Sequence, residues 1–488
     1  MNITQEPLFD IVPVYSPIIY TVEDLNIIGS FTKVKYIAEV YIGKDSGNLV
    51  TANNKVGTYK TTPNNKGVGI FDFSNVVRNF VDSDNLGSIV AKANASFFSA
   101  FKLTQFNIKR HGIHLIDRYC TNENCLRFMQ VEFKVEFAST LGGTVSVASN
   151  IVVKSNAIQI YNGTAQHEDP ILQSGDSFGI DVGGEGLNLI LNENIANGRF
   201  LTNAPTTQYI GRNDYHTLAF FNGQNGSYTT GNTAEVNAVS SNRSVAYIKF
   251  KFYKADGSTL SDIDVTNTPV NGGKRGFSNE SSTKFIFIGV GMGNHLGRNF
   301  NTFSNHYNQT VKYTVQAYNN NDDPISRIYT FEIIEDDCKG FEKIRLAWLN
   351  RIGAWDYYSF TKKSIRNVNT SRTQYTQLSG TWNESTYKLD SFRGGRKDFK
   401  VKAKERITLN TDFINEENSL WLEELFTSPE VYIINEYQVN DASGIINKYV
   451  QPVLVTSSTY TRKTQANDRL MQYSITIERS KERVIQGA

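Results

Sequence analysis

Four potential metal ligands lie close together in the sequence. They are His111 and His114, with two residues between them, and Cys120 and Cys125, with four residues between them. Histidine nitrogen and cysteine sulfur are ligands that Zn2+ favours in closed tetrahedral sites. The His-His-Cys-Cys order matches no common zinc finger, and residues 121–124 (TNEN) favour a hairpin loop. Three interpretations stay open: a metal site, a disulfide or cysteine pair across that loop, and residues with no shared role. We predict no metal and keep these four residues as the candidate ligands.

Other chemically capable residues are scattered. The remaining histidines lie in polar, loop-like sequence: His167, His216, His295 and His306. The run GVGMGN at 289–294 lacks the complete G-x-G-x-x-G spacing of a dinucleotide loop, and a turn after a strand explains it better. The acidic clusters carry no EF-hand pattern, and nothing pairs their carboxylates as a glycosidase requires. We therefore expect no catalytic residue, no cofactor and no enzymatic activity.

A basic ribbon occupies residues 393–406. Its seven members are Arg393, Arg396, Lys397, Lys400, Lys402, Lys404 and Arg406. Phe399, Val401 and Ala403 alternate with the lysines, which predicts a strand with one basic face and lysines about 7 Å apart. Such a face suits a phosphate backbone or an acidic neighbour. A solvated strand face is the plainer alternative.

An aromatic segment precedes the ribbon. Residues 341–363 (FEKIRLAWLNRIGAWDYYSFTKK) hold two of the four tryptophans, crowded around Gly353. Large aromatic side chains dominate both cores and interfaces. We take five of them as candidate interface residues: Trp348, Trp355, Tyr357, Tyr358 and Phe360.

Length and composition indicate a multi-domain, mainly β protein. The chain has 488 residues, 12% aromatic and 20% charged, with only four methionines. Aromatic and β-branched residues favour sheets, and 488 residues exceed what one core supports. The net charge of +2 gives no general attraction to nucleic acid or membrane, and three cysteines form no disulfide framework. No apolar run is long enough to span a membrane and no signal peptide is recognisable, so we expect cytoplasmic synthesis without a membrane anchor.

The pattern along the chain predicts four parts. Residues 1–20 carry three prolines and read either as an extended arm that docks on a neighbour or as an edge strand of their own domain. An N-terminal β domain spans 21–159, a Gly/Asn-rich middle β domain spans 160–340 and is a possible insertion, and a C-terminal β domain spans 341–488. We expect antiparallel sandwich or jelly-roll-like domains with few short helices.

Individual elements follow from local patterns. Residues 32–42 and 127–138 alternate as strands, and the second has one apolar and one mostly charged face, which predicts a sheet that is wet on one side. Ser74 is a plausible N-cap for a short helix. Residues 419–426 (SLWLEELF) form the convincing helix of the last part, stopped by Pro429, and a hairpin follows in the last forty residues.

Four segments resemble a known family. KIRLAWLNRIGAWDYYSF at 343–360, SLWLEELFTSPEVYII at 419–434, PVYSPIIYTV at 13–22 and GIFDFSNVVRNFV at 69–81 are similar to virion structural proteins of tailed phages that infect Bacteroidetes, the crAss-like phage group. The resemblance covers about the first 140 and the last 150 residues. The middle domain resembles nothing we can name.

The resemblance implies a non-enzymatic component of the tail barrel or of the rings below the portal. It implies a homo-oligomeric ring, contacts with other tail or portal-proximal proteins, passing non-specific contact with genomic DNA, and location in the virion tail. The basic ribbon would line a DNA channel or meet an acidic ring. The alternative is a receptor- or carbohydrate-binding adhesin, whose surface tyrosines, such as Tyr209, Tyr215 and Tyr228, stack on sugars.

Overall fold

The computed structural model describes most of the chain. The described residues are 1–7, 9, 11–44, 47–83, 119–121, 124–165, 173–174, 177–178, 190–191, 198–222, 245–267, 285–296, 301–334, 340–381, 384–389, 391–435, 450–461 and 471–481. They fall into two compact units. Unit 1 comprises Met1–Glu335, Leu349–Asp356 and Glu436–Asn447, and unit 2 comprises Asp336–Trp348, Tyr357–Asn435 and Lys448–Ala488.

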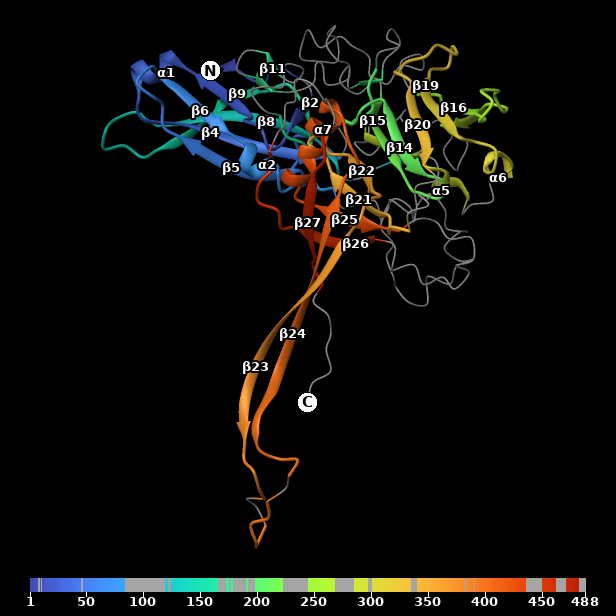
Figure 1. The fold of residues 1–488 in the computed structure, drawn as a ribbon. Coiled ribbons are helices and arrows are strands. Elements are labelled where there is room, and N and C mark those ends of the chain that lie inside the picture. Colours follow the sequence, from blue (N-terminus) through green and yellow to red (C-terminus); the bar gives the residue numbers. More distant parts are fainter. Residues whose placement is uncertain are drawn as a thin grey trace. The chain divides into compact units, whose positions relative to one another are not determined.

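The N-terminal part of unit 1 contains two sheets (Figure 1). The smaller has the order β1 (Asn2–Gln5), β3 (Ile19–Glu23), β6 (Val68–Asp72). The larger has the order β2 (Ile11–Pro13), β10 (Ile158–Tyr161), β8 (Leu126–Ala138), β4 (Thr32–Gly43), β5 (Lys55–Thr61), and β9 (Ser146–Lys154) also pairs with β8. Within the first twenty residues, β1, β2 and the start of β3 pair with other strands of unit 1, β1 and β2 as edge strands and β3 as an inner one.

One apolar core joins these two sheets. Tyr20 of β3 packs on Phe133 of β8 with ring centroids 5.8 Å apart, and Phe71 of β6 packs on the same ring at 5.7 Å. Short helices α1 (Leu25–Ser30) and α2 (Ser74–Val77) lie at strand ends. Ser74 is the first residue of α2 and Phe73 is its N-cap, so the predicted capping role is wrong. Asp72 fixes this start instead, because its carboxylate accepts a hydrogen bond from the Ser74 N–H at 3.0 Å.

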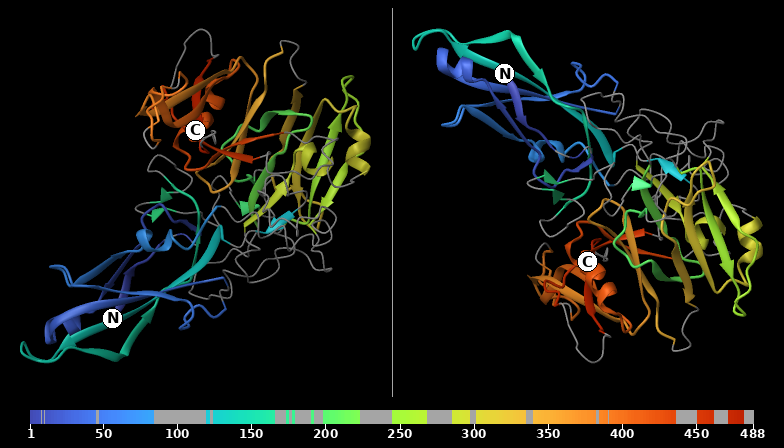
Figure 2. Two further views of the ribbon diagram at one scale, coloured as in Figure 1. Left: turned by 90° about the horizontal axis from the view of Figure 1, so that it is seen from below. Right: turned by 90° about the horizontal axis from the view of Figure 1, so that it is seen from above.

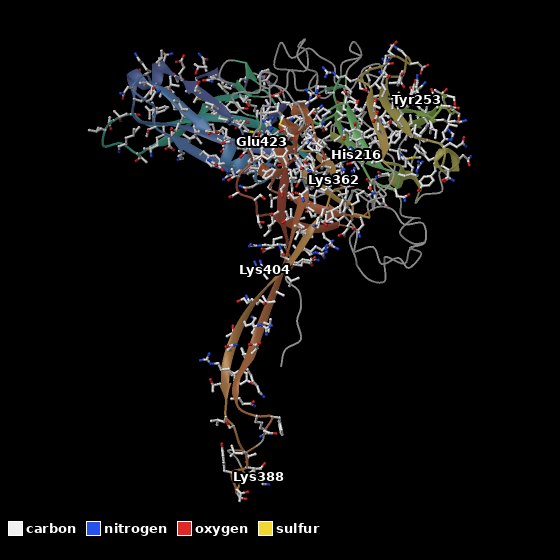
Figure 3. The ribbon with its side chains drawn as sticks, in the orientation of Figure 1. His216, Tyr253, Lys362, Lys388, Lys404 and Glu423 are labelled. Atoms are coloured by element: carbon white, nitrogen blue, oxygen red, sulfur yellow. The ribbon has the colours of Figure 1, made fainter. Side chains whose placement is uncertain are left out.

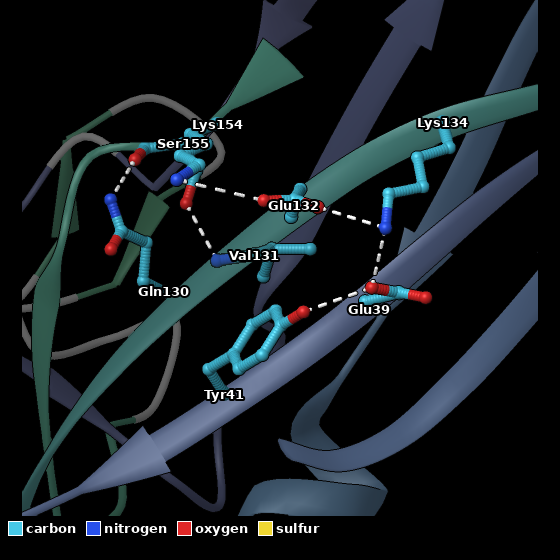
Figure 4. A network of polar contacts seen from close by, with 8 residues as sticks. All are labelled: Glu39, Tyr41, Gln130, Val131, Glu132, Lys134, Lys154 and Ser155. Carbon is cyan, nitrogen blue, oxygen red and sulfur yellow. Dashed lines mark hydrogen bonds and ion pairs between the residues drawn. The ribbon is translucent and has the colours of Figure 1, made fainter. Parts of the chain in front are cut away.

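The carboxylates on the charged face of β8 are buried beneath ion pairs, whose lysines Lys134, Lys60 and Lys154 are 24%, 48% and 53% exposed. Glu132 and Glu136 on that face are only 9% and 7% exposed. Lys134 bridges Glu132 and Glu39 at 2.9 and 2.8 Å (Figure 4). Lys55 reaches Glu39 at 2.6 Å. Strand β8 lies between β4 on one side and β9 and β10 on the other, so its long side chains lie across those of its neighbours. The alternation in the sequence is confirmed, and the face that we expected to meet water does so through the lysines of these ion pairs rather than through the carboxylates.

The second pair of sheets in unit 1 comes from the middle of the chain. The four-stranded sheet has the order β13 (Ile190–Leu191), β15 (Thr217–Asn222), β18 (Phe285–Gly289), β7 (Tyr119–Thr121). The five-stranded sheet has the order β14 (Thr207–Gly211), β20 (Tyr329–Ile334), β19 (Lys312–Tyr318), β16 (Tyr247–Tyr253), β17 (Ile263–Thr266), and Figure 2 shows these green-to-yellow strands as one layer. The short pair β11 (Gln173–Ser174) and β12 (Ser177–Phe178) and helices α5 (Met292–Leu296) and α6 (Asn301–His306) complete this part.

A shared aromatic core holds this second pair of sheets together. Phe220 of the four-stranded sheet and Phe250, Tyr313 and Phe331 of the five-stranded sheet belong to one buried cluster. Tyr119 of β7 joins it, because its hydroxyl donates to the Val265 carbonyl at 2.9 Å. Strand β7 thus contributes to the middle sheets although it precedes them by more than sixty residues.

Unit 2 is built on a seven-stranded sheet. Its order is β22 (Trp355–Phe360), β21 (Ile344–Leu349), β25 (Val431–Ile434), β26 (Val450–Val455), β27 (Ser474–Arg479), β24 (Gly395–Asn410), β23 (Ile365–Gln377). Helix α7 (Glu416–Thr427) covers the predicted helical segment, and β25 begins two residues after Pro429. Antiparallel pairing of β26 with β27 confirms the predicted hairpin.

The predicted fold class is confirmed: the chain is mainly β, with sandwich-like pairs of sheets and few short helices. Most described strand pairs are antiparallel. Parallel pairs link β2 to β10, β13 to β15 and β14 to β20, and each involves a strand at the edge of its sheet. The boundaries predicted for the four parts stay a prediction.

Candidate functional site

Strands β23 and β24 form a long two-stranded hairpin. They pair antiparallel from Ile365 with Thr408 to Gln377 with Gly395, and the register shifts once, between Thr373 and Gln374. Strand β24 also pairs with β27, but only over Arg406–Asn410. Beyond Glu405, within the described part of the chain, these two strands therefore pair only with each other, and Figure 1 shows them running on past the rest of their sheet. Gly394 and Gly395, with φ of +95° and +76°, bring the chain back into β24.

The pairing register divides the hairpin into two faces. One face, here called the lysine face, carries five of the seven ribbon residues: Lys397, Lys400, Lys402, Lys404 and Arg406. Their cross-strand partners on β23 are uncharged: Tyr375, Thr373, Ser371, Asn369 and Asn367. The opposite face carries Arg396, Asp398 and Glu405. Arg393 precedes the strand, with its guanidinium 5.6 Å from the Phe392 ring centroid. The strand predicted from the alternating lysines is confirmed.

Two buried carboxylates anchor the base of the hairpin. On the lysine face, Glu478 of β27 contacts Lys404 at 2.8 Å and Arg406 at 2.9 Å. These two cations hold the pKa of Glu478 below its usual range. On the opposite face, Glu405 contacts Arg366 at 2.8 Å and Arg479 at 3.4 Å. Each side of the three-stranded junction thus has its own ion-pair cluster, which fixes where the hairpin leaves the sheet.

The outer part of the hairpin lacks such anchors on its lysine face. Lys400 and Lys402 are exposed, and no carboxylate among the described residues pairs with either ammonium group. Lys397 only donates to the Phe392 carbonyl at 3.4 Å. The one acid of this stretch, Asp398, lies on the opposite face, where its pairing with Arg372 lowers its pKa. Figure 3 shows Lys404 at the base and Lys388 at the far end of this arm.

The predicted interface aromatics lie in the interior. Trp348, Trp355, Tyr357 and Phe360 are at most 3% exposed, and Tyr358 is half-buried. In unit 2, the rings of Trp348 and Tyr358 lie 5.1 and 6.1 Å from Trp421 of α7, which covers strands β21 and β22. These side chains pack inside the chain, so any surface for a neighbouring molecule has to use other residues.

The turn between β21 and β22 has a defined structural role in unit 1. The Asn350 side-chain oxygen accepts hydrogen bonds from the N–H groups of Ile352 and Ala354, both at 3.0 Å. Its amide nitrogen donates to the Leu201 carbonyl at 2.8 Å. Gly353 has φ of +84°, and a Cβ there would lie 2.1 Å from the Asn162 carbonyl oxygen. Position 353 therefore requires glycine, both for its backbone conformation and for the close approach to Asn162.

The candidate metal ligands fall largely outside the described residues. His111 and His114 lie there, and Cys120 is described only as a backbone position in β7. Cys125 is buried beside β8. Within the described part of the chain, no group of three or more His, Cys, Asp or Glu residues could hold a metal ion. The choice among a metal site, a cysteine pair and unrelated residues stays open.

Three of the remaining histidines are core residues, contrary to their loop-like sequence. His216, His295 and His306 are buried. His295 stacks on Phe303 with centroids 4.0 Å apart, and His306 contacts the Ser261 carbonyl at 2.8 Å. His167 lies outside the described residues.

The glycines of the run at 289–294 have a packing role. A Cβ at Gly291 would lie 2.5 Å from the Asp214 carbonyl oxygen, and one at Gly293 would lie 2.4 Å from the Asn213 carbonyl oxygen. These glycines allow the start of α5 to approach residues 213–214 closely, as a turn after a strand requires.

Sequence reasoning missed one pattern and one element. Residues 175–179 (GDSFG) have the G-x-S-x-G spacing of a hydrolase nucleophile turn. Ser177 lies in β12, paired antiparallel with Ser174, whereas that motif needs a strand-to-helix turn. Strand β23 was not predicted. Its thirteen residues without Gly or Pro, rich in Thr and β-branched side chains, are the signal that could have found it.

Comparison with known proteins adds no family assignment. The sequence matches no protein-family model and no curated protein. Among the helices of the described residues, none is both long and apolar enough to cross a membrane.

Proposed function

We propose that this protein is a non-enzymatic structural component of a phage tail, which assembles into a homo-oligomeric ring. The hairpin of β23 and β24 is the observation that carries the proposal. It extends nine residue pairs beyond Glu405 of β24 with both faces largely exposed. A two-stranded ribbon alone is marginally stable in water, so an arm of this length needs a partner.

The free edges of the hairpin indicate what that partner is. Among the strands of the described residues, β23 is the edge strand of its sheet, and none pairs with the outer part of β24 on its other side. Unpaired N–H and C=O groups on such edges are templates for pairing with another chain. If β23 of one copy pairs with β24 of the next, the contact is head-to-tail and repeats by rotation. A closed ring of hairpins is a barrel, and a barrel leaves no edge unpaired.

The resemblance of four segments to virion structural proteins supports the same function. The segments at 343–360 and 419–434 form strands β21, β22 and β25 of the sheet that carries the hairpin, together with helix α7. They are packing elements, which agrees with a rigid platform rather than with an active site. The tail ring, its neighbouring tail or portal-proximal proteins and its place in the virion belong to this proposal.

The test is the mass and shape of the purified full-length protein, alone and mixed with other tail proteins of the same virion. Light scattering gives the mass, and negative-stain imaging gives the shape. We expect closed rings of one fixed copy number in at least one setting. A chain that remains a monomer in both settings contradicts the proposal.

A second candidate function is a carbohydrate-binding adhesin. Tyr209 of β14 is 61% exposed, and Tyr247 and Tyr318 stack with centroids 5.1 Å apart on the same sheet. Exposed aromatic rings on a flat sheet can stack on sugars. Tyr215 is half-buried and Tyr228 lies outside the described residues. A glycan array separates the candidates, because saturable binding that is lost in a Tyr209→Ala variant would favour the adhesin.

A further inference from the structure

Charge is segregated along this chain. Residues 365–410, the hairpin and its connection, hold ten Lys and Arg against four Asp and Glu, a net charge of +6. The remaining residues hold 40 Lys and Arg against 44 Asp and Glu, a net charge of −4. The small net charge of the whole chain therefore conceals one strongly basic arm. An exposed cluster of one sign is the usual electrostatic footprint of a polyanion-binding surface.

The geometry of the lysine face suits a regular row of phosphates. Lys400 and Lys402 are alternate residues of one strand, so their Cα atoms lie about 6.8 Å apart. That distance equals two steps of the 3.4 Å axial rise per phosphate along one strand of duplex DNA. The facing residues on β23, Thr373 and Ser371, carry hydroxyl groups, which commonly donate to phosphate oxygens. A two-stranded β-ribbon is also narrow enough for the major groove.

The anchoring ion pairs separate two kinds of basic residue. Lys404 and Arg406 already contact Glu478, which holds the hairpin to its sheet. Lys397, Lys400 and Lys402 lie beyond this anchor, on a face where the pairing register places no carboxylate. Burying three ammonium groups against a neighbouring protein would demand matching carboxylates, whereas a duplex supplies one phosphate at every step.

We propose that the lysine face binds the phosphate backbone of duplex DNA through Lys397, Lys400 and Lys402, without reading its sequence. This inference rests on the proposed function, because in a ring of hairpins the lysine faces of all copies turn toward the axis through which DNA passes. The contact is electrostatic, so it guides the duplex while allowing it to slide.

The experiment measures binding of the full-length protein to a fluorescently labelled 25-base-pair duplex by anisotropy, over a series of salt concentrations. The test variant carries Lys397→Gln, Lys400→Gln and Lys402→Gln. Each lost phosphate contact lowers the slope of log K against log salt by about 1, so we expect a decrease of about 3 per bound copy. At about 0.1 M salt the affinity should fall by about 10²-fold or more.

Two further variants control for charge and for folding. Lys35, Lys66 and Lys251 are exposed lysines outside the hairpin with no described ion pair, and their triple change to Gln alters the net charge equally. This control should bind DNA within about twofold of the wild type. The triple change of Lys397, Lys400 and Lys402 to Arg should retain binding, because it preserves the charges. Circular dichroism melting verifies that all variants are folded.

Each outcome has a defined meaning. Equal loss in the test and control variants, or no loss in the test variant, overturns the inference. Binding of poly-glutamate as tightly as DNA would also overturn it, because the face would then fit an acidic protein surface. Light scattering on the same samples reports assembly independently. If rings form but the lysine-to-glutamine changes do not weaken DNA binding, the proposed function stands and the inference is refuted. If the protein stays a monomer and these changes do weaken DNA binding, the inference stands and the proposed function is refuted.

Discussion

At the scale of single residues, the clearest feature is a carboxylate held by three donors. Glu39 on β4 contacts Lys134 at 2.8 Å and accepts a hydrogen bond from the Tyr41 hydroxyl at 2.9 Å (Figure 4). It also contacts Lys55 at 2.6 Å. Burial alone would raise the pKa of Glu39, but these hydrogen bonds outweigh it and place the pKa at about 2. The ionised form is thus strongly preferred in the folded chain.

This pKa predicts how stability depends on pH. Because the folded pKa lies below the unfolded one, the stabilisation is complete above about pH 5 and is lost as the pH falls toward 2. A Glu39→Gln variant should lose about 2 to 3 kcal/mol of unfolding free energy at pH 7 and converge with the wild type near pH 2. Urea unfolding at several pH values measures this. Asp262→Asn, at an exposed position just before β17, is the control, and parallel pH profiles for Glu39→Gln and wild type would contradict the assignment.

Gly353 gives a second prediction at this scale. A Gly353→Ala variant combines a positive φ with a Cβ that would lie 2.1 Å from the Asn162 carbonyl oxygen, so we expect a loss of about 3 kcal/mol or more. Gly257 is the matched control, since its φ is +82° and a Cβ there meets nothing within 4 Å. Its change to Ala should cost only about 1 kcal/mol. Similar urea midpoints for the two variants would show that the backbone around residue 162 yields easily.

At the scale of elements, helix α7 depends on its first turn. The Asn415 side chain accepts a hydrogen bond from the Asn418 N–H at 2.9 Å, and Glu416 and Glu417 favour the helix N-terminus by their charge. An Asn415→Ala variant should lose about 1 kcal/mol of stability, whereas Asn415→Asp retains the acceptor and should lose almost none. Thermal unfolding of the three proteins tests this. Equal losses in both variants would mean that the amide of Asn415 matters more than its oxygen.

The elements also show what the sequence could predict. Strand β8, helix α7 and the basic strand β24 follow from local periodicity, because their buried and exposed positions repeat within a dozen residues. Periodicity does not show which strand pairs with a given strand, or which residue forms an ion pair with a given side chain. Nothing local to residues 119–121 indicates that β7 pairs with β18, and nothing near Lys404 indicates that Glu478 anchors it.

For the candidate site, the lysines and their spacing were predictable from the alternation in β24, but their partners were not. The aromatic segment was wrongly predicted to form an interface for a related reason. Tryptophan is favoured both in protein cores and in interfaces, so its presence in the sequence does not distinguish the two. Only the helix that covers Trp348 decides between the two.

At the scale of the whole molecule, the outer part of the hairpin has no described contact with the rest of its own chain. Every contact described for residues 373–400 lies within the hairpin itself or reaches the facing Arg372. Its hydrogen bonds do not support the seven-stranded sheet, because β24 pairs with β27 only from Arg406 onward. A long element that adds so little to the fold of its own chain is expected to act on another molecule.

This separation predicts that assembly and stability respond differently to one deletion. Replacing residues 373–400 by Asn-Gly joins Arg372 to its cross-strand partner Val401 through a two-residue turn. We expect the unfolding free energy of the isolated chain to change by no more than about 0.5 kcal/mol, because the contacts described for the removed residues stay within the hairpin. In contrast, light scattering should show that ring formation is abolished, because the edges that pair neighbouring copies are gone.

The lysine-to-glutamine variant is the matched control for this deletion. It keeps both strands and their edges, so it should assemble like the wild type while losing affinity for DNA. If the shortened chain still forms rings of normal mass, the hairpin is not the assembly element and the ring, where it exists, closes through other surfaces. If the shortened chain instead unfolds at markedly lower urea, the outer hairpin supports its own unit. The premise that its partner is another molecule then fails.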